Sequence, residues 1–405
     1  MLSPRTSMKT ASILLCTAPL IAGCNRDAPS PGHASAPSPP TAKIASIYAS
    51  AGANMLAPAA AHALPLVYVP NSRSASVTVI DPRTYRVVRT FPTGKLPQHV
   101  VPSYDLKTLW VANNNGNSLT PIDPLTGHDG QRVSVDDPYN LYFTPDGRYA
   151  LVIAERRKRI DWRDAKTMKL VKSLQTDCKG VDHVEFTTDG RYAIATCEFS
   201  GELVKVDLAR RAVAGYLALD PGFMKRLPAR ITHYVGKFRD TRTSMPQDIR
   251  SSPDGRVFYV ADMKKNGVFL IDPESMKTIG FIRTGIGTHG LYPSRDGRSL
   301  YVTNRGWNTV FGGRRGPGSI GVIDFATRKL IATWPIPGGG SPDMGNVTAD
   351  GKELWVSGRY DDEVYVFDTR TGKLTHRIPV GREPHGLTVW PQPGRYSLGH
   401  TGNMR

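Results

Sequence analysis

The run Leu300-Tyr301-Val302-Thr303-Asn304 recurs with small changes along the chain and decides how the sequence folds. Each copy alternates aliphatic or aromatic residues with β-branched ones and ends in a turn-forming residue, which is typical of a short β-strand. The other copies are Val67-Tyr68-Val69-Pro70-Asn71, Leu109-Trp110-Val111-Ala112-Asn113, Phe258-Tyr259-Val260-Ala261-Asp262 and Leu354-Trp355-Val356-Ser357-Gly358.

Two further signals repeat around these runs. A second predicted strand follows about ten residues later and closes on an aliphatic residue and Asp, as in Ile271-Asp272. An Asp-Gly turn precedes most copies, as in Pro253-Asp254-Gly255. Asp-Gly favours tight hairpins because Gly adopts positive φ and the Asp side chain binds nearby N–H groups. A third strand follows the second, and a fourth strand runs into the Asp-Gly turn. One repeat of about 42 residues therefore carries four strands.

Four strands per repeat predict an all-β fold, a β-propeller of seven four-stranded antiparallel blades. The strand before each Asp-Gly turn is the innermost of its blade. The chain opens with three strands and ends with a single one, Pro384 to Trp390, so we expect the C-terminal strand to pair with the N-terminal blade and close the ring. The predicted innermost strands begin near Pro97, Pro138, Val181, Pro246, Thr288, Pro342 and Pro384.

The recurring runs resemble the repeat of the YVTN family of β-propeller proteins, which is related to YncE-like and cytochrome d1-like propellers. The similarity covers nearly the whole chain after residue 64. It implies the propeller fold but no single activity, because similar propellers include lactonases, haem d1-binding domains, dehydrogenase subunits and proteins that bind ligands or surfaces.

The N-terminus resembles a bacterial lipoprotein signal. Arg5 and Lys9 precede an apolar stretch over residues 11–22 that is too short to span a bilayer. It ends in a branched aliphatic residue and two small residues before Cys24. The resemblance implies that Cys24 is lipidated and, because Asn25 follows it, that the protein is anchored on the periplasmic side of the outer membrane. Cleavage elsewhere would give a soluble periplasmic or secreted protein.

The sequence predicts four parts. Residues 1–23 form the signal, and residues 24–63, rich in Ala, Pro and Ser, form a tether with too little apolar surface to fold. The propeller covers residues 64–395, and residues 396–405 form a C-terminal tail.

The amino-acid composition indicates which classes of molecule the protein can bind. The 405 residues include 52 Lys and Arg against 35 Asp and Glu, a formal net charge of +17. The length excludes a disulfide-stapled mini-protein, and 40% hydrophobic residues exclude a disordered chain. The excess of positive charge favours anionic partners: a small molecule, a glycan or an acidic protein. The sequence contains no Gly-x-Ser-x-Gly elbow, phosphate-binding loop or His-Glu-x-x-His motif.

The topology places one polar residue of each innermost strand at the end of the central channel where these strands begin, which we call the top. His and Asp there could hold a divalent metal ion, ligate a haem iron or bind an anionic ligand. His99 and His183 sit one position later than His289 and His385, so the two pairs should point differently. A metal site of two His with carboxylates, drawn from His289, His385, Asp343 and Asp248, is then favoured over a four-His site. The predicted ring is His99, Asn140, His183, Asp248, His289, Asp343 and His385.

Basic residues gather in loops that the same topology places on the top face. Arg interleaved with aromatic residues suits stacking and phosphate contact, which admits single-stranded nucleic acid and equally a polyanionic glycan. The predicted anion-binding residues are Arg156, Arg157, Lys158, Arg159, Arg305, Trp307, Arg314 and Arg315.

Cys178 and Cys197 flank the Asp189-Gly190 turn at nearly equal distances. In an exported protein this spacing predicts a cross-strand disulfide. The alternative joins both cysteines with His183 in a metal or haem site.

The sequence therefore predicts an exported, lipid-anchored monomer that acts as a binding module, with an anionic ligand or partner at its top face and no obligatory cofactor. One alternative is a periplasmic metal-dependent hydrolase similar to lactonases, or a protein that handles haem d1. A further alternative binds single-stranded nucleic acid.

Overall fold

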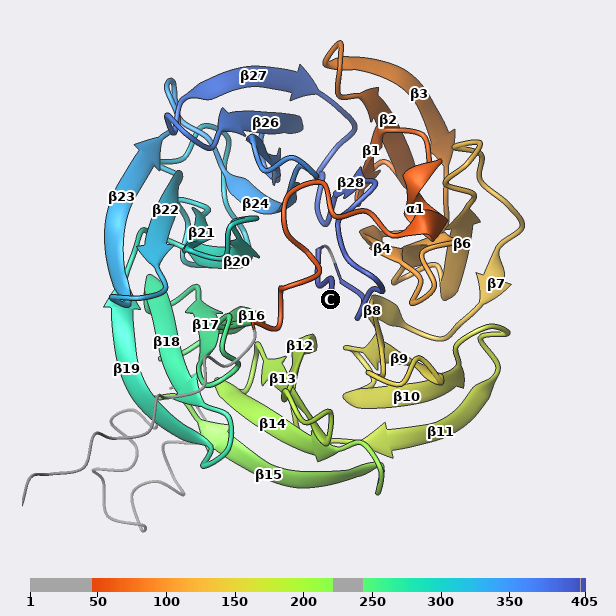
Figure 1. The fold of residues 1–405 in the computed structure, drawn as a ribbon, viewed down its shortest axis with the longest axis vertical. Helices are drawn as coiled ribbons and strands as arrows, with labels where there is room; N and C mark the ends of the chain where they lie inside the picture. The colour runs from red at the N-terminus through yellow and green to blue at the C-terminus, as the bar shows by residue number, and fades with distance from the viewer. Residues whose placement is uncertain (1–45, 221–242, 401) are drawn as a thin grey trace, which may run out of the picture. The chain divides into compact units, whose positions relative to one another are not determined.

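The computed structural model describes residues 46–220, 243–400 and 402–405. They form seven four-stranded antiparallel sheets arranged as blades around a central channel (Figure 1). The prediction of an all-β, seven-bladed propeller is confirmed. The predicted signal, Cys24 and the first part of the tether lie outside the described residues. None of the described residues belongs to a helix with the length and apolar character that a membrane span requires.

The blades follow one another along the chain, and within each blade the strands run in order from the innermost outward. Blade 1 is β28 (Thr388–Trp390), β1 (Leu66–Asn71), β2 (Ser76–Asp81) and β3 (Arg86–Pro92). Blade 2 is β4 (Pro97–Pro102), β5 (Leu109–Asn113), β6 (Ser118–Ile122) and β7 (Val133–Ser134). Blade 3 is β8 (Pro138–Phe143), β9 (Tyr149–Ala154), β10 (Arg159–Asp164) and β11 (Leu170–Gln175). Blade 4 is β12 (Val181–Phe186), β13 (Tyr192–Cys197), β14 (Glu202–Asp207) and β15 (Ala212–Ala218).

The remaining blades repeat this order. Blade 5 is β16 (Pro246–Ser251), β17 (Phe258–Asp262), β18 (Gly267–Asp272) and β19 (Lys277–Arg283). Blade 6 is β20 (Thr288–Pro293), β21 (Ser299–Asn304), β22 (Ser319–Asp324) and β23 (Lys329–Pro335). Blade 7 is β24 (Pro342–Val347), β25 (Glu353–Gly358), β26 (Glu363–Asp368) and β27 (Leu374–Pro379).

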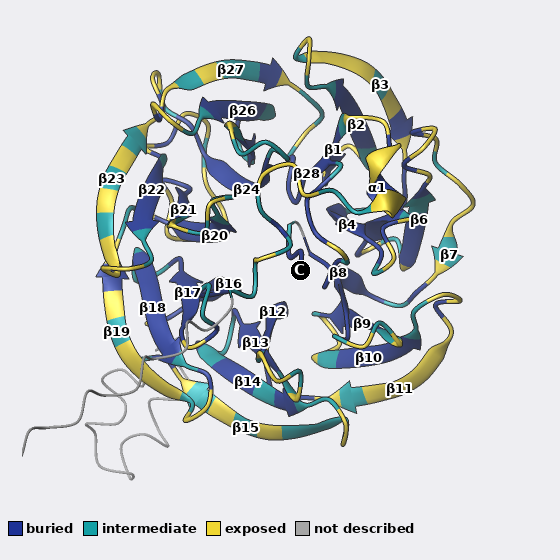
Figure 2. Cartoon of the chain, viewed as in Figure 1, coloured by how far each residue is buried: buried dark blue, intermediate teal, exposed yellow. Residues whose placement is uncertain are grey.

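Burial explains the sequence of each strand. Figure 2 shows the inner strands buried and the outer strands largely exposed. In blade 3 every residue of β8 is buried, whereas five of the six residues of β11 are exposed. The inner strands lie between two neighbouring blades, so both of their faces require apolar residues. The recurring Tyr-Val-Thr-Asn-like runs form the second strands, such as β5, in which all five residues are buried.

The ring closes through pairing of strands from the two ends of the propeller. β28 pairs antiparallel with β1, with Val67 opposite Val389 and Leu66 opposite Trp390. Trp390 is buried in a cluster with Tyr68 and Val100. The chain thus reaches the innermost position of blade 1 only after it has passed through all other blades.

The N-terminal segment packs on the bottom face, where the Asp-Gly turns lie. Ile47 N donates to Pro253 O, and Asn54 N donates to Ala349 O. The short helix α1 (Pro58–Ala61) buries Ala60 completely. Residues 46–63, assigned to the tether from composition, are therefore part of the folded body. Ala51, Ala60 and Ala63 of this segment are buried with almost no loss of side-chain entropy, which the composition alone did not show.

The C-terminal tail enters the channel from the bottom as a hairpin, in which Ser397 bridges to Met404. Phe143 N donates to Leu398 O, and His400 N donates to Leu141 O, so the tail follows β8 upward inside the ring. The C-terminus lies in the middle of the ring, with the N-terminal segment beside it (Figure 1). These two segments close the bottom of the channel.

We expect Trp390→Ala to lower the free energy of unfolding by about 3–5 kcal/mol, because it removes a buried aromatic side chain from the closing strand. Urea denaturation followed by far-UV circular dichroism measures this. Trp307→Ala is the matched control, since Trp307 is 38% exposed, and should cost less than about 1 kcal/mol. Equal losses for the two variants would contradict the importance of this strand.

Candidate functional site

All seven predicted channel residues are buried. The pairing register shifts near the start of the innermost strands, for example between Thr288 and Leu291 and between Pro97 and His99. Such a bulge lets consecutive side chains face the same side of a strand. The channel residues therefore form two layers. The upper layer contains His289 and Asp343, from the second positions of β20 and β24, and His385, which precedes β28. The lower layer, from the third strand position, contains His99, Asn140, His183 and Asp248.

Asp343 is the centre of the upper layer. Its Oδ1 lies 3.0 Å from His289 Nδ1 and 2.7 Å from Arg305 Nε, and its Oδ2 lies 2.7 Å from His385 Nδ1. Arg359 approaches the same carboxylate at 3.5 Å. Burial alone would raise the pKa of Asp343, but Arg305 and the two histidines hold it well below its usual range. Asp343 is therefore a permanent anion.

The two upper histidines are neutral. Burial and the neighbouring Arg305 lower the pKa of His289 to about 4, and burial lowers that of His385 to about 3. Arg305 lies 2.8 Å from His289 Nε2, and a guanidinium can only donate, so the imidazole proton of His289 resides on Nδ1 and faces Asp343. Arg305 was predicted to bind anions in a loop; it is instead buried and neutralised in the channel.

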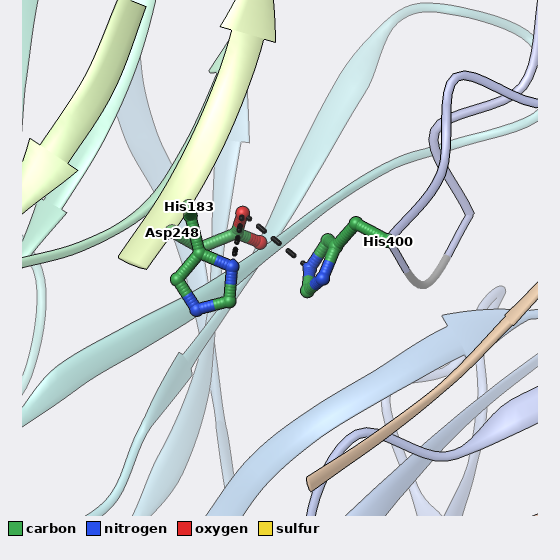
Figure 3. A group of neighbouring side chains, drawn as sticks. All are labelled: His183, Asp248 and His400. Carbon is green, nitrogen blue, oxygen red and sulfur yellow. Dashed lines mark ion pairs between the residues drawn. The ribbon is translucent and has the colours of Figure 1, made fainter. Parts of the chain in front are cut away.

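The lower layer gathers around Asp248. His183 Nδ1 lies 3.9 Å and His400 Nε2 lies 3.6 Å from Asp248 Oδ1 (Figure 3). Asn140 donates from Nδ2 to Nδ1 of His400 at 2.9 Å. Arg250 reaches Asp248 at 3.3 Å, and with both histidines it lowers the pKa of this carboxyl despite burial. His400 comes from the tail, for which the repeat pattern gave no position.

The structure does not bring the predicted metal set together. Asp248 belongs to the lower layer. His289 and His385 contact Asp343 in the upper layer, and Arg305 contacts both Asp343 and His289. Among the described residues, the His, Cys, Asp and Glu side chains that converge closely enough to hold a metal ion are His183, Asp248 and His400.

A second ring, not foreseen from the sequence, sits above the innermost strands. Its members are the residues that directly follow each second strand. On one side Glu155 and Glu198 lie with Asp182; burial and the neighbouring carboxylates raise the pKa of Asp182 and Glu198, and raise that of Glu155 to about 8. The ring residues are Ser72, Asn114, Glu155, Glu198, Met263, Arg305 and Arg359. Their constant position after the recurring run is the signal that could have identified them.

Most of the predicted basic loop residues form ion pairs. Arg156 lies 2.6 Å from Asp137, which is fully buried. Arg157 and Arg159 both contact Asp136, and Arg315 contacts Glu363. Lys158 has no ion pair in the described part of the chain. The strong positive field expected of these loops is therefore reduced by carboxylates that the charge count did not locate.

One part of the top face keeps an excess of positive charge. A pocket of about 300 Å³, here called the rim pocket, lies among the top loops of blades 6, 7 and 1. Arg314 lies 2.5 Å from Asp362, and Arg73 lies 2.6 Å from Glu383. The exposed guanidinium of Arg382 has no ion-pair partner among the described residues. The rim pocket is lined by Arg73, Phe311, Gly312, Gly313, Arg314, Tyr360, Asp362, Arg382 and Glu383.

The loop after β21 that forms one wall of the rim pocket is held in place by its own contacts. Tyr360 donates from its hydroxyl to Val310 O, and Trp307 donates from Nε1 to Gly313 O at 3.1 Å. A Cβ on Gly312 would lie 2.4 Å from the Tyr360 ring, so only glycine allows this close approach. The wall is thus preorganised rather than an open loop.

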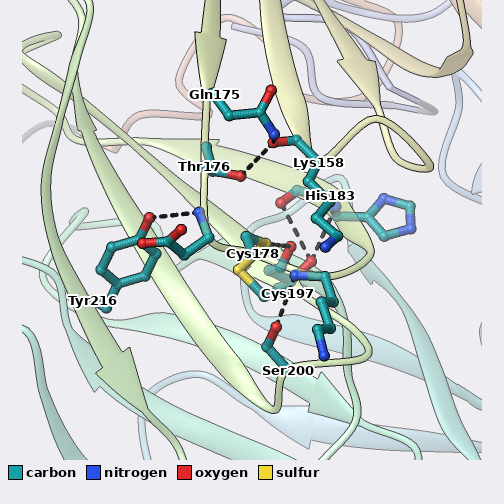
Figure 4. Close-up of a disulfide and its surroundings, with 11 residues drawn as sticks. Lys158, Gln175, Thr176, Cys178, His183, Cys197, Ser200 and Tyr216 are labelled. Carbon is teal, nitrogen blue, oxygen red and sulfur yellow. Dashed lines mark hydrogen bonds between the residues drawn. A yellow bond between two sulfur atoms is a disulfide. The ribbon is translucent and has the colours of Figure 1, made fainter.

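Cys178 and Cys197 form a disulfide, with their Cα atoms 5.2 Å apart (Figure 4). The alternative site, in which both cysteines and His183 bind a metal or haem, has no free thiolate to supply in this state.

The comparisons with known proteins agree with this architecture. The family model described as YNCE-like beta-propeller matches residues 40–218 and 228–393.

The chain belongs to the YNCE-like β-propeller family.

Solved structures with the same fold come from proteins of several kinds. Hydrazine synthase of Kuenenia stuttgartiensis has 19% identity and a TM-score of 0.56, covering 71% of this chain and 87% of its own. The dihydro-haem d1 dehydrogenase NirN has 17% identity and a TM-score of 0.56, with 80% and 75% covered. A candidate 6-phosphogluconolactonase of Bacteroides uniformis has 17% identity and a TM-score of 0.61, with 80% and 98% covered. At such identities these likenesses show the fold alone. No curated protein matches the sequence significantly.

We expect stability to fall in acid because His289 and His385 are neutral in the folded state. In the unfolded chain these histidines bind a proton near pH 6.5, whereas in the fold they do so only near pH 4 and pH 3. The unfolded state therefore holds more protons between these values, and each histidine lowers the free energy of unfolding by about 1.4 kcal/mol per pH unit as the pH falls.

Urea denaturation between pH 7 and pH 4.5 measures this slope. His385→Gln should flatten it by about 1.4 kcal/mol per pH unit, whereas His128→Gln, at an exposed position, should leave it unchanged. A slope unaffected by His385→Gln would contradict the neutral state of this histidine.

Proposed function

We propose that this protein is an exported binding protein that holds an anionic ligand in the rim pocket. The observation that carries the proposal is the composition of that pocket: three arginines stand against two carboxylates, with Phe311 and Tyr360 beside them. Loops on a rigid propeller scaffold are where binding residues usually lie.

The exposed aromatic side chain supports a ligand with an apolar or planar part. Phe311 is 79% exposed, the largest exposed fraction among the large hydrophobic side chains of the described residues. A bound ligand would cover this ring, while Arg382 supplies a charge that is not already used in an ion pair. We infer an acidic small molecule or glycan that places its anionic group on Arg382 and Arg314 and a flat face on Phe311.

We also propose that the protein is exported and anchored through a lipid on Cys24, on the periplasmic side of the outer membrane. The disulfide between Cys178 and Cys197 supports export, because disulfides persist in oxidising compartments. The basic residues and apolar stretch before Cys24 support the signal.

The double variant Arg314→Ser/Arg382→Ser should weaken binding of a sulfated oligosaccharide about tenfold or more and reduce the salt dependence of its affinity, because two phosphate- or sulfate-binding cations are lost. Isothermal titration calorimetry at two salt concentrations measures both effects. Arg210→Ser/Arg298→Ser is the matched control: it removes the same charge from side chains that are each 84% exposed and lie at bottom turns.

Equal losses in both double variants would show that net charge, not the rim pocket, attracts the oligosaccharide, and would overturn the proposal. Oligothymidine serves as a second probe. If oligothymidine binds more tightly than the oligosaccharide and Phe311→Ala abolishes this binding, the ligand is single-stranded nucleic acid rather than a glycan, since bases stack on aromatic side chains.

Replacement of the proposed lipidation site, Cys24→Ser, should move the protein from the membrane fraction to the soluble periplasmic fraction, because a signal without its cysteine cannot be acylated. Metabolic labelling with radioactive palmitate and immunoblotting of the fractions measure this. Wild-type protein that carries no label would contradict the anchor and leave ordinary secretion.

A further inference from the structure

The lower layer of the channel holds a second site, separate from the rim pocket and independent of the function proposed for it. We propose that His183, Asp248 and His400 bind one divalent transition-metal ion (Figure 3). The three side chains come from β12, β16 and the C-terminal tail, and all three are fully buried.

The geometry of the three groups is close to that of a bound site. Their ligating atoms all lie within 4.8 Å of one another. Metal–nitrogen bonds of about 2.1 Å would be reached by small inward shifts of the side chains. Two imidazole nitrogens with one carboxylate oxygen suit Zn²⁺, Fe²⁺, Co²⁺, Ni²⁺ or Cu²⁺, whereas Ca²⁺ and Mg²⁺ prefer oxygen ligands alone.

Asn140 fixes the orientation of the His400 ring. Its amide donates to His400 Nδ1 at 2.9 Å, so the neutral ring carries its proton on Nε2, which faces Asp248. A metal ion bound at Nε2 takes the place of this proton, so metal uptake should release protons.

His99 provides an independent observation. It is fully buried, and neither of its ring nitrogens has a hydrogen-bond partner among the residues that the structure describes. Its ring centroid lies 5.1 Å from that of His400 and 5.5 Å from that of His183. A buried imidazole without partners is costly unless another group satisfies it. A metal ion, or a water bound to one, beside His183 and His400 is such a group.

The metal would also link the tail to the blades. His400 lies near the tip of the hairpin that closes the channel from below, while His183 and Asp248 belong to blades 4 and 5. A ligand that binds only the folded state raises stability by mass action. Metal uptake should therefore be visible both as stoichiometry and as a rise in the melting temperature.

The test uses the tag-free mature chain after dialysis against a chelator. Zn²⁺ and Co²⁺ are titrated, bound metal is counted by mass spectrometry, and melting temperatures are recorded with and without metal. We expect one ion per chain, visible-region Co²⁺ absorption that indicates nitrogen ligation, and a metal-dependent rise in melting temperature. His400→Ala should abolish all three, and His99→Ala should weaken affinity about 10–100-fold.

His128→Ala is the matched control, because His128 is exposed and lies outside the channel, and it should bind metal as the wild type does. The melting temperature of metal-free His400→Ala shows whether the variant is folded, and His183→Ala provides a second route if it is not. A wild-type chain that takes up no Zn²⁺ or Co²⁺ overturns the proposal whatever the variants do. Undiminished uptake by folded His400→Ala overturns it as well.

Discussion

The pairing of β28 with β1 is the contact on which the rest of the molecule depends. It joins residues more than three hundred positions apart in sequence and closes the ring of seven blades. The same segment brings Gly386 against His99: Val100 N donates to Gly386 O, and a Cβ at position 386 would lie 2.0 Å from His99 Nδ1. The segment that closes the ring therefore also positions His99 in the lower layer.

Two buried carboxylates organise the channel in different ways. Arg305 and Arg359 pair with the carboxylate of Asp343, and two neutral histidines contact it. The negative charge of Asp343 is therefore compensated within the protein. Asp248 has Arg250 on one side and faces His183 and His400 on the other, which gives the lower layer donor atoms that converge. The difference arises from one strand position, because the bulge turns neighbouring residues to the same side.

The repeat pattern was sufficient to predict the number of blades and the strands of each blade. Local periodicity carries this information, since every blade repeats the same burial. Three aspects could not be read from it. The partners of the basic loops lie in other blades, as with Arg315 and Glu363; the bulges that separate the layers depend on pairing; and the tail that supplies His400 belongs to no repeat.

The tail hairpin supplies polar side chains to the channel although it forms no strand of any blade. Residues 396–405 contribute His400 near Asp248, and Arg405 lies 2.7 Å from the buried Glu185. None of the described tail residues belongs to a strand of a blade, although Gly399 bridges to Tyr142 of β8. Substitutions in ten residues could therefore change which groups line the floor of the channel while all seven blades keep their sequence. A β-propeller with such an insert can diverge in ligand preference faster than its scaffold diverges in fold.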